Sequence, residues 1–432
     1  MIIDKSKIVH AVEACFPHAF VLLYRDIKYK VGVYIFRQKY DRIENRIKRK
    51  GTPLKVVFLA INSSVWKYEH LYKLMEADPN FQPLVLVCPQ VYYGEEFMWK
   101  QMKTTLSFFK EKGYNVKSSY DEVQNAFINL KELQPDVLMY TNPYKGLIMK
   151  KYYLGLATNA LTCYISYYYP KGITGYHKWL LLFESKLWMN FIASSAEYQR
   201  VIHKDNCRVV GYPMYEAFKD GSYSACDWKS PEKKYKRVIW APYHHIVTGD
   251  ADIIQGSTFL RYADFMWELA IKYQNSVQFV FKPHPHLRSN LEAHPDWGKE
   301  KTDAYYEMWK NGINTNLAEG EYIDLFNTSD ALIHDCGSFA VEYLYINKPA
   351  MFLAFNKNYL HHLESTGIEA LECHEIGFNE EDINGFVRSI INLDQDKKES
   401  ERNAFYQKHL LPPNGLTASE NMLNEIKNKL RI

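Results

Sequence analysis

The sequence lacks any apolar run long enough to cross a bilayer. A membrane-spanning helix needs about 18 consecutive apolar residues, and no stretch of the 432-residue chain approaches that length. The start of the chain also lacks the basic segment followed by an apolar stretch that marks a signal peptide. We therefore expect a cytoplasmic protein that does not span a membrane.

Cysteine is scarce, and its spacing argues against two classes of small stabilised domain. Zinc fingers carry closely spaced Cys-x-x-Cys pairs and disulfide frameworks carry regularly spaced cysteines, and this chain has neither pattern. The seven cysteines are Cys15, Cys88, Cys163, Cys207, Cys226, Cys336 and Cys373. This usage fits a reducing compartment, and we expect no metal site and no disulfide framework.

Internal repeats, low-complexity tracts and recognised nucleic-acid-binding motifs are also missing. What is present is ordinary for a globular chain, because 47% of the residues are hydrophobic and 24% are charged, although 34 tyrosines is a high number. A chain of this length is expected to form two or three domains, each with its own core.

Positive charge is concentrated near the start of the chain. Residues 1–55 contain 8 Lys and 5 Arg against 5 acidic residues, a net charge of +8, whereas the whole chain carries only +3. Apolar stretches at 20–24 and 31–36 lie in the same segment. Anionic lipid attracts such a segment, so the inner face of the cell membrane is a candidate partner. The alternative is a solvated basic helix packed on the body of the protein, and nucleic acid is not expected.

Strand-like and helix-like patterns alternate through the first half of the chain. Short, mostly apolar segments predict buried strands at residues 54–61, 84–88, 136–140 and 161–165. Helical periodicity predicts helices at residues 68–77, 95–112 and 121–133. This alternation is typical of a doubly wound α/β domain with a parallel sheet.

A second series follows a polar connection at residues 219–236. Strands are predicted at 238–241, 277–281, 331–334 and 350–355, with helical patterns at 259–273 and 322–328. Two Rossmann-like, doubly wound domains facing a central cleft form the GT-B-like α/β architecture, which we predict here. We assign a basic segment to 1–51, the first domain to 52–215, the second to 216–399, and a C-terminal helical segment that returns to the first domain to 400–432.

One segment of the second series has the geometry of an anion site. The strand at 331–334 runs into a turn from Asp335 to Ser338, and helical spacing begins at Phe339. Backbone N–H groups and the positive dipole end at a helix start favour phosphate, and the Ser338 hydroxyl adds a donor. The alternative is that Ser338 only caps the helix.

A second segment ends another predicted strand with Lys282-Pro-His-Pro285. The two prolines restrict the backbone on both sides of His284, at the strand end where open α/β sheets bind ligands. A cationic Lys282 and a donating His284 suit a diphosphate leaving group. The alternative is that His284 is only a rigid turn residue.

Together these segments resemble the CDP-glycerol glycerophosphotransferase family of teichoic-acid and capsule polymerases. That family has a basic-x-His-Pro element followed by a Ser-Asp-x-Leu-Ile-x-Asp-Tyr-Ser-Ser turn, an acidic-Tyr pair and a Lys-Pro pair. The counterparts here are Lys282 to Pro285, Ser329 to Ser338, Glu342-Tyr343 and Lys348-Pro349. The resemblance covers roughly residues 52–395, and its specific part lies in the second half.

The resemblance implies a reaction and a set of donor-binding residues. An acceptor hydroxyl would attack the β-phosphorus of CDP-glycerol or another cytidine-activated donor, so that CMP leaves. His284 and Ser338 would hold the pyrophosphate with help from Lys282 and Gly337, Asp335 belongs to the same turn, and Glu342 would accept from the ribose hydroxyls. The alternative for Glu342 is an exposed acid at the start of a helix. A glycan or polyol phosphate, in some cases lipid-linked, would be the acceptor.

No metal or cofactor is required by this scheme. Asp250-Ala-Asp252 has the outline of a metal-binding DxD motif, but it lies in a loop that contains glycine, and we interpret it as a solvated turn.

Two departures from the family bear on catalysis. The family's His-Gly-x-Pro motif, whose histidine resembles a general base, is absent from residues 164–172, where Tyr167 is nearest to the expected position. The family's Pro-Thr-x-Arg is replaced by Pro242-Tyr-His-His245. An imidazole can accept a proton or neutralise phosphate, so His244 and His245 are catalytic candidates beside His284, and Ser257 on the same loop is a donor-binding candidate.

Two other functions remain open from the sequence. A His-Pro element followed by a serine turn also resembles CMP-sugar users such as bacterial sialyltransferases, so an inverting glycosyltransferase is the enzymatic alternative. The second alternative is a catalytically silent scaffold that kept the fold and lost the base.

Overall fold

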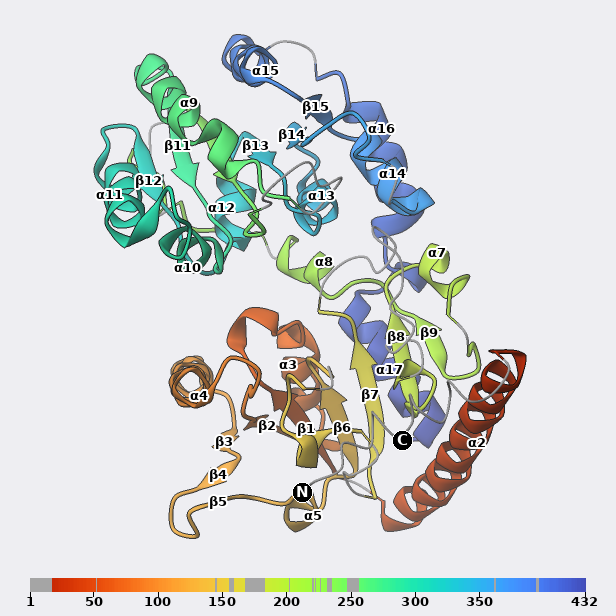
Figure 1. Ribbon diagram of the computed structural model, residues 1–432. Coiled ribbons are helices and arrows are strands. Elements are labelled where there is room, and N and C mark those ends of the chain that lie inside the picture. Colours follow the sequence, from red (N-terminus) through yellow and green to blue (C-terminus); the bar gives the residue numbers. More distant parts are fainter. Residues whose placement is uncertain are drawn as a thin grey trace.

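Two parallel sheets organise the protein (Figure 1). The computed structural model describes residues 18–51, 53–143, 146–154, 159–167, 183–201, 203–219, 221, 223–225, 227–230, 235–246, 256–360, 363–393 and 396–432, with the backbone alone for 18–26. The candidate DxD residues Asp250 and Asp252 lie outside the described residues, as do Cys15 and Cys226. No helix in the described part of the chain is both long and apolar enough to span a bilayer.

The first unit is built on a seven-stranded sheet in the order β3-β2-β1-β6-β7-β8-β9. Its strands are β1 (Leu54–Ala60), β2 (Phe81–Val87), β3 (Val116–Ser118), β6 (Val137–Tyr140), β7 (Leu161–Ile165), β8 (Met189–Ile192) and β9 (Cys207–Val209), and a separate ribbon pairs β4 (Tyr120–Asp121) with β5 (Ala126–Phe127). Its helices are α2 (His18–Lys50), η1 (Ser63–Val65), α3 (Glu69–Ala77), α4 (Glu95–Glu111), α5 (Leu130–Leu133), η2 (Lys150–Tyr152), α7 (Ser195–Tyr198) and α8 (Met214–Ala217).

The second unit is built on a six-stranded sheet in the order β12-β11-β10-β13-β14-β15. Its strands are β10 (Lys236–Ala241), β11 (Val277–Phe281), β12 (Thr315–Leu317), β13 (Ala331–His334), β14 (Ala350–Leu353) and β15 (Glu375–Gly377). Its helices are α9 (Phe259–Lys272), α10 (Leu287–Glu292), α11 (Gly298–Asn311), α12 (Ile323–Thr328), α13 (Phe339–Glu342), η3 (Tyr343–Ile346), α14 (Ser365–Glu372), α15 (Glu380–Asn392) and α16 (Glu399–Phe405). The final elements are η4 (Tyr406–Leu410), η5 (Pro413–Gly415) and α17 (Ala418–Leu430).

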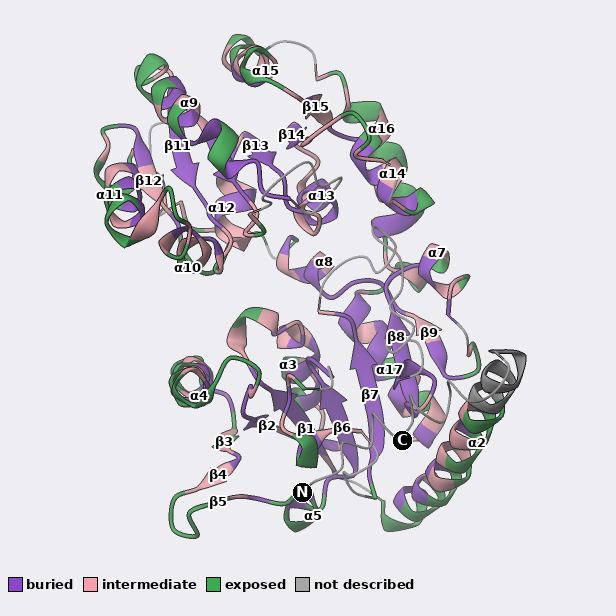
Figure 2. Cartoon of the chain, in the orientation of Figure 1, coloured by how far each residue is buried: buried purple, intermediate pink, exposed green. Residues whose placement is uncertain are grey.

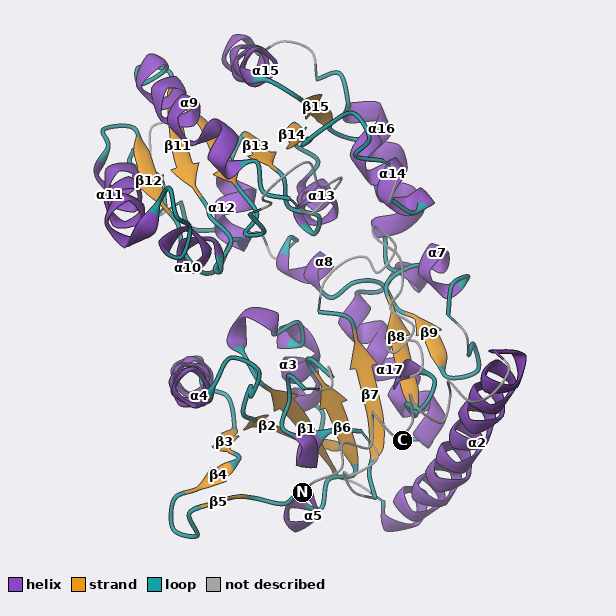
Figure 3. Cartoon of the chain, in the orientation of Figure 1, coloured by secondary structure: helices purple, strands orange, loops and turns teal. Residues whose placement is uncertain are grey.

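The central strands of both sheets are buried on both faces, as a comparison of the burial colours in Figure 2 with the strands in Figure 3 shows. Every residue of β6, β11 and β13 is buried, which explains why these strands read as continuous apolar runs and not as alternating patterns. The two parallel α/β units confirm the predicted GT-B-like architecture. Strands β11 and β13 have the predicted bounds.

The predicted helix at residues 121–133 is wrong. The Asp121 carboxylate accepts the N–H groups of Val123 and Gln124 at 2.9 and 3.0 Å, and Asn125 adopts a positive φ of 50°. A side chain that binds nearby backbone amides in this way competes with helix formation and favours a turn. The segment therefore forms the β4-β5 ribbon, and a helix is present only at α5.

The two units are joined by two chain crossings that pack on one another. Gly211, in the first crossing, has a φ of +94°, and an added Cβ would lie 2.7 Å from the Cβ of Pro412 in the second crossing. The Asn421 side-chain amide donates to the carbonyl oxygens of Val210 and Pro413 at 3.2 and 3.0 Å. Glycine is therefore required at position 211 by both conformation and space.

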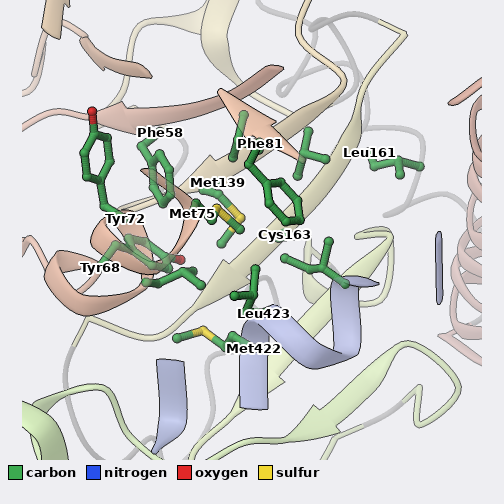
Figure 4. Close-up of a cluster of buried hydrophobic side chains, with 14 of the residues drawn as sticks. Phe58, Tyr68, Tyr72, Met75, Phe81, Met139, Leu161, Cys163, Met422 and Leu423 are labelled. Carbon is green, nitrogen blue, oxygen red and sulfur yellow. The ribbon is translucent and has the colours of Figure 1, made fainter. Parts of the chain in front are cut away.

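The last helix, α17, packs on the first unit although the chain reaches it from the second. Met422 and Leu423 lie in the same buried cluster as Phe58 of β1 and Met75 of α3 (Figure 4). Lys427 also forms an ion pair with Asp78 at 2.7 Å. Figure 1 shows this helix among the elements of the first unit.

Strand order places three loops of the second unit together. Strand β10 pairs with β11 on one side and with β13 on the other, all parallel. The carboxyl ends of the three strands therefore lie at one edge of the sheet, where the connections leave in opposite directions and open α/β sheets bind ligands. The predicted candidates at positions 242–245, 282–285 and 335–338 follow directly on these three strands.

Candidate functional site

Backbone and side-chain hydrogen bonds tie the three loops into one unit. The backbone N–H of His284 donates to the Pro242 carbonyl oxygen at 3.1 Å. The Asn290 side-chain amide donates to the His244 carbonyl oxygen at 2.8 Å, and the Tyr243 N–H donates to Asp335 at 2.5 Å. The loop that follows β10 is thus held between the other two.

Three imidazole rings gather at this edge, and we refer to His244, His284 and His286 as the histidine cluster. The rings of His244 and His284 are stacked, with centroids 4.1 Å apart and planes inclined by 28°. The ring of His286 lies 5.6 Å from each of the other two. The exposed His245 lies farther out, with its centroid 6.3 Å from that of His244.

The environment keeps the histidine cluster neutral. Burial lowers the pKa of His284 to about 3, with repulsion from His244, His286 and Lys282 acting in the same direction. Burial and the neighbouring imidazoles lower the pKa of His244 to about 4, and burial lowers the pKa of His286. The Nδ1 atom of His284 accepts the His286 backbone N–H at 3.2 Å, so the neutral ring carries its proton on Nε2 and can donate from there.

Lys282 is a buried lysine whose ammonium has no ion pair or hydrogen bond among the described residues. Its side chain is only 4% exposed. Burial lowers its pKa, and the more distant carboxylates of Glu321, Glu319 and Asp227 only oppose that effect. The charge of Lys282 is thus held in an enclosed place where only more distant carboxylates offset it, and a bound anion would supply a close counter-charge.

The turn that follows β13 leaves open space beside Gly337 and Ser338. An added Cβ on Gly337 would meet no atom within 4 Å. Ser338 occupies the N-cap position of α13, but its side chain makes no capping hydrogen bond. Its hydroxyl lies 3.3 Å from the Cys336 sulfur. The interpretation of Ser338 as a helix cap alone is therefore wrong, because the hydroxyl is not used on the helix.

Asp335 holds the loops in position. Its carboxylate accepts the backbone N–H groups of Tyr243 and Thr258 at 2.5 Å and the Thr258 hydroxyl at 2.8 Å. The residue is 1% exposed, and burial raises the pKa of its carboxyl to about 6 despite these hydrogen bonds. In this structure its oxygens face protein donors, so the geometry assigns it a positioning role.

Glu342 is buried, and the hydroxyls of two tyrosines contact its carboxylate. It accepts hydrogen bonds from the hydroxyls of Tyr322 and, at 3.4 Å, of Tyr212, and it is 2% exposed. Burial raises its pKa, with Lys67 acting in the opposite direction. The alternative of an exposed acid at the start of a helix is therefore wrong.

Ser257 lies just before α9, and its hydrogen bonds are to backbone atoms. Its Oγ accepts the Phe259 N–H at 3.2 Å, and its own N–H donates to the His245 carbonyl oxygen at 2.7 Å. The structure thus places Ser257 and His245 at the rim of the histidine cluster, on a loop whose residues 247–255 lie outside the described residues.

The first unit supplies residues that reach this edge. Lys67 donates to the Tyr322 hydroxyl at 3.3 Å, and the ring of Tyr93 lies 5.6 Å from that of His286. The Tyr212 hydroxyl donates to the carbonyl oxygen of Tyr167 at 3.0 Å. The region of the missing His-Gly-x-Pro motif lies outside the described residues from position 168 onward.

Four of these residues were not predicted from the sequence: His286, Tyr93, Lys67 and Tyr322. A signal existed only for His286, because it follows His284 at a spacing of two in Pro283-His-Pro-His286. The others come from distant parts of the chain, and no local pattern marks them.

A sequence model of one family matches the chain over residues 194–428, which is more than half of its length. The description of that family is CDP-Glycerol:Poly(glycerophosphate) glycerophosphotransferase. The chain belongs to this family. The predicted resemblance is confirmed, and the match includes every candidate residue of the second unit. No curated protein sequence gives a significant match to this member of the family.

Solved structures similar to this glycerophosphotransferase-family chain share its fold at low identity. A variant of the wall teichoic acid polymerase TagF soaked with CDPG is 13% identical, with a TM-score of 0.57, over 95% of this chain and 97% of that chain. The S. aureus MnaA-UDP co-structure is 15% identical, with a TM-score of 0.53, over 88% of this chain and 97% of that chain. A putative UDP-N-acetylglucosamine 2-epimerase from Listeria monocytogenes is 15% identical, with a TM-score of 0.54, over 88% of this chain and 97% of that chain.

Proposed function

We propose that this family member transfers a polyol phosphate, either glycerol phosphate or ribitol phosphate, from a CDP-activated donor to a hydroxyl of a glycan or teichoic-acid-like acceptor, releasing CMP. One observation carries the proposal. Lys282 is enclosed and forms no ion pair with any described residue, and it lies at the strand edge that also holds the neutral histidine cluster and the open turn at Gly337. Family membership supports the choice of a CDP-activated donor, since the description of the family names CDP-glycerol.

The donor diphosphate would occupy the edge formed by the three loops. Lys282 would neutralise its charge, His284 would donate from Nε2, and the Ser338 hydroxyl and the adjacent backbone N–H groups would complete the contacts. Catalysis of phosphoryl transfer depends mainly on such positioning and charge neutralisation. The acceptor oxygen forms a bond to the β-phosphorus, and the bond from that phosphorus to the bridging oxygen breaks, leaving CMP.

The acceptor hydroxyl must lose a proton, and His244 is the proposed base. Its Nδ1 atom is buried and has no hydrogen-bond partner among the described residues. Its lowered pKa keeps the imidazole neutral near neutral pH, so one of the two ring nitrogens is free to accept a proton. The proton would therefore move from the acceptor oxygen to His244 while His284 remains on the phosphate. His245, which is exposed on the same loop, would act on the phosphate charge or on the approaching acceptor.

Glu342 would bind the donor ribose only after its tyrosine contacts change. In the structure the hydroxyls of Tyr322 and Tyr212 donate to this carboxylate. A ribose hydroxyl can replace the Tyr322 hydroxyl as a donor, because both donate a single O–H group to the same acceptor.

The experiment that tests the proposal is incubation of the protein separately with CDP-glycerol, CDP-ribitol and CMP-sialic acid, each with an acceptor, while CMP release is measured. We expect release from at least one CDP-polyol and its loss in the His284→Ala variant. Release from CMP-sialic acid alone would identify an inverting glycosyltransferase. Nucleotide binding without release from any donor would identify a silent scaffold, and either result would overturn the proposal.

A further inference from the structure

Exposed aromatic rings form a row that leads from the surface of the first unit to the histidine cluster. Tyr92 and Tyr93 are 71% and 46% exposed, and their ring centroids lie 5.0 Å apart. The ring of Tyr93 lies 5.6 Å from that of His286. His286 in turn lies 5.6 Å from each of the other two rings of the histidine cluster. Single exposed apolar residues are common, but adjoining aromatic rings beside a site indicate an interaction surface.

The backbone that carries the two tyrosines is held in place. The Val91 N–H donates to the Leu147 carbonyl oxygen at 2.8 Å. Gly94 has a φ of +93° and leads the chain directly into α4. The ring of Phe97, in the first turn of that helix, lies 5.0 Å from the ring of Tyr93. Rings that are already fixed lose little conformational freedom when a ligand stacks on them.

The aromatic row and the proposed ribose contact lie on opposite sides of β10. His286 follows β11, whereas Glu342 and the open turn at Gly337 follow β13, and β10 separates these two strands in the sheet. Figure 1 shows α10, which begins one residue after His286, on the same side of the molecule as α4. The cytosine of the donor is joined to its ribose, so the β13 side is its place. The row is therefore left for the acceptor, whose hydroxyl approaches the proposed base His244.

The charges beside the row favour a neutral acceptor. Glu95 and Glu96 are exposed in the first turn of α4, and neither forms an ion pair among the described residues. Their carboxylates offset the positive end of the helix dipole, which would otherwise attract an anion. They would also repel a chain of phosphodiesters. A sugar ring is uncharged, and the C–H groups on its face suit the negative face of an aromatic ring.

We propose that Tyr92 and Tyr93 form an acceptor subsite that binds a neutral sugar ring of a glycan. The sugar stacks on the tyrosine rings, and a hydroxyl farther along the same glycan reaches His244. This role in transfer rests on the function proposed above, and it makes the acceptor a glycan and not a poly(polyol phosphate).

Sugar binding is measured first without donor, so that the result does not depend on turnover. In calorimetric titration we expect the full chain to bind at least one neutral tetrasaccharide of glucose, galactose or N-acetylglucosamine, and to bind a glycerol phosphate tetramer more weakly. Tyr92→Ala/Tyr93→Ala should bind the sugar at least about tenfold more weakly, since the contact area of two rings is lost. Tyr92→Phe/Tyr93→Phe keeps both rings and should stay within about threefold of the unchanged protein.

A matched control is Tyr34→Ala, which removes the same ring at a 64% exposed position on α2. It should bind the sugar as the unchanged protein does. Binding of none of the three tetrasaccharides, tighter binding of the glycerol phosphate tetramer, or an equal loss in the control would overturn the subsite.

Kinetics and donor titration separate failure of the subsite from failure of the proposed reaction. In Tyr92→Ala/Tyr93→Ala we expect the KM for a glycan acceptor to rise at least about tenfold with kcat unchanged, because the rings bind the ground state and the transition state alike. The Kd for CDP-glycerol should not change. A rise in that Kd would assign the rings to the cytosine and overturn the acceptor subsite. Ring-dependent sugar binding without CMP release from any donor would retain the subsite and overturn only the reaction.

Discussion

Lys282 and Lys348 are both enclosed lysines, and they differ in what their ammonium groups contact. Lys348 donates to the carbonyl oxygens of Asn327 and Ser329 at 2.5 and 2.6 Å, whereas Lys282 has no such partner among the described residues. A residue that is unfavourable for folding is a candidate for function. The pair therefore contrasts Lys282, which we propose to bind the donor, with Lys348, whose ammonium binds carbonyl oxygens of the protein itself.

We expect Lys282→Met to lower kcat/KM for CMP release by about a hundredfold, since a contact to the transferring phosphate is lost. Its thermal unfolding temperature should stay the same or rise, because an unpaired buried charge is removed. The matched variant Lys348→Met should instead lower the free energy of unfolding by about 1–3 kcal/mol, because two carbonyl oxygens lose their donor. Destabilisation by Lys282→Met with normal activity would contradict the assignment.

The histidine cluster should make stability fall in acid. The folded-state pKa of His244 is about 4, below its ordinary value of 6.5, so the unfolded chain binds a proton first as the pH drops. Stability is therefore lost as the pH falls from about 6.5 toward 4. Asp335 acts with the opposite sign, because its folded-state pKa of about 6 is above the ordinary 3.8.

The contribution of His244 can be isolated by measuring the unfolding temperature at pH 7 and at pH 4.5, for the unchanged protein and for a His244 variant. Asp335 is present in both proteins, so its effect cancels in the comparison. We expect His244→Asn, which cannot take up the proton, to lose less stability over this range than the unchanged protein. Parallel profiles for the two proteins would show that His244 is not held neutral by the fold.

At the scale of the element, the chain crossing at Gly211 needs glycine for two reasons, its positive φ and the close approach of Pro412. Gly211→Ala should lower the free energy of unfolding by about 2–4 kcal/mol, because it adds backbone strain and a clash with Pro412. The control is Gly113→Ala, where φ is +78° but an added Cβ meets nothing within 4 Å. That control should lose only about 1 kcal/mol in denaturant unfolding, and equal losses would argue against the packing of the two crossings.

The elements that support the site were predictable because their signal is local. Strands β11 and β13 are apolar runs that end at Lys282 and Asp335, and the structure gives them the expected bounds. The error at 121–133 has an equally local cause, since periodicity does not reveal that Asp121 binds the amides of the following residues. Lys67 and Tyr93 could not be found from the sequence, because their place at the site depends on how the two units pack.

At the scale of the whole molecule, Tyr322 connects the two units to the proposed ribose site. Its hydroxyl donates to Glu342 and receives a hydrogen bond from Lys67 of the first unit. Tyr322→Phe should tighten donor binding several-fold, since a ribose hydroxyl no longer competes for the carboxylate. The same variant should lower the free energy of unfolding by about 1–2 kcal/mol, because buried Glu342 loses a donor.

Calorimetric titration with CDP-glycerol and denaturant unfolding would measure the two effects separately. The control is Tyr306→Phe, because the buried Tyr306 hydroxyl has no hydrogen-bond partner among the described residues. Donor binding should not change in this control, and the free energy of unfolding should stay the same or rise. Weaker donor binding by Tyr322→Phe would contradict the idea that Tyr322 and the ribose share Glu342.

The place of α17 in the core of the first unit has a consequence for biosynthesis. Met422 and Leu423 complete a cluster otherwise formed by α2, α3, α4 and strands of the first sheet, yet the ribosome makes them after every strand of the second unit. The first unit, although translated first, reaches its complete core only after α17 has left the exit tunnel. Until then we expect the apolar surface that α17 covers to stay exposed, which inverts the usual order in which earlier domains finish folding first.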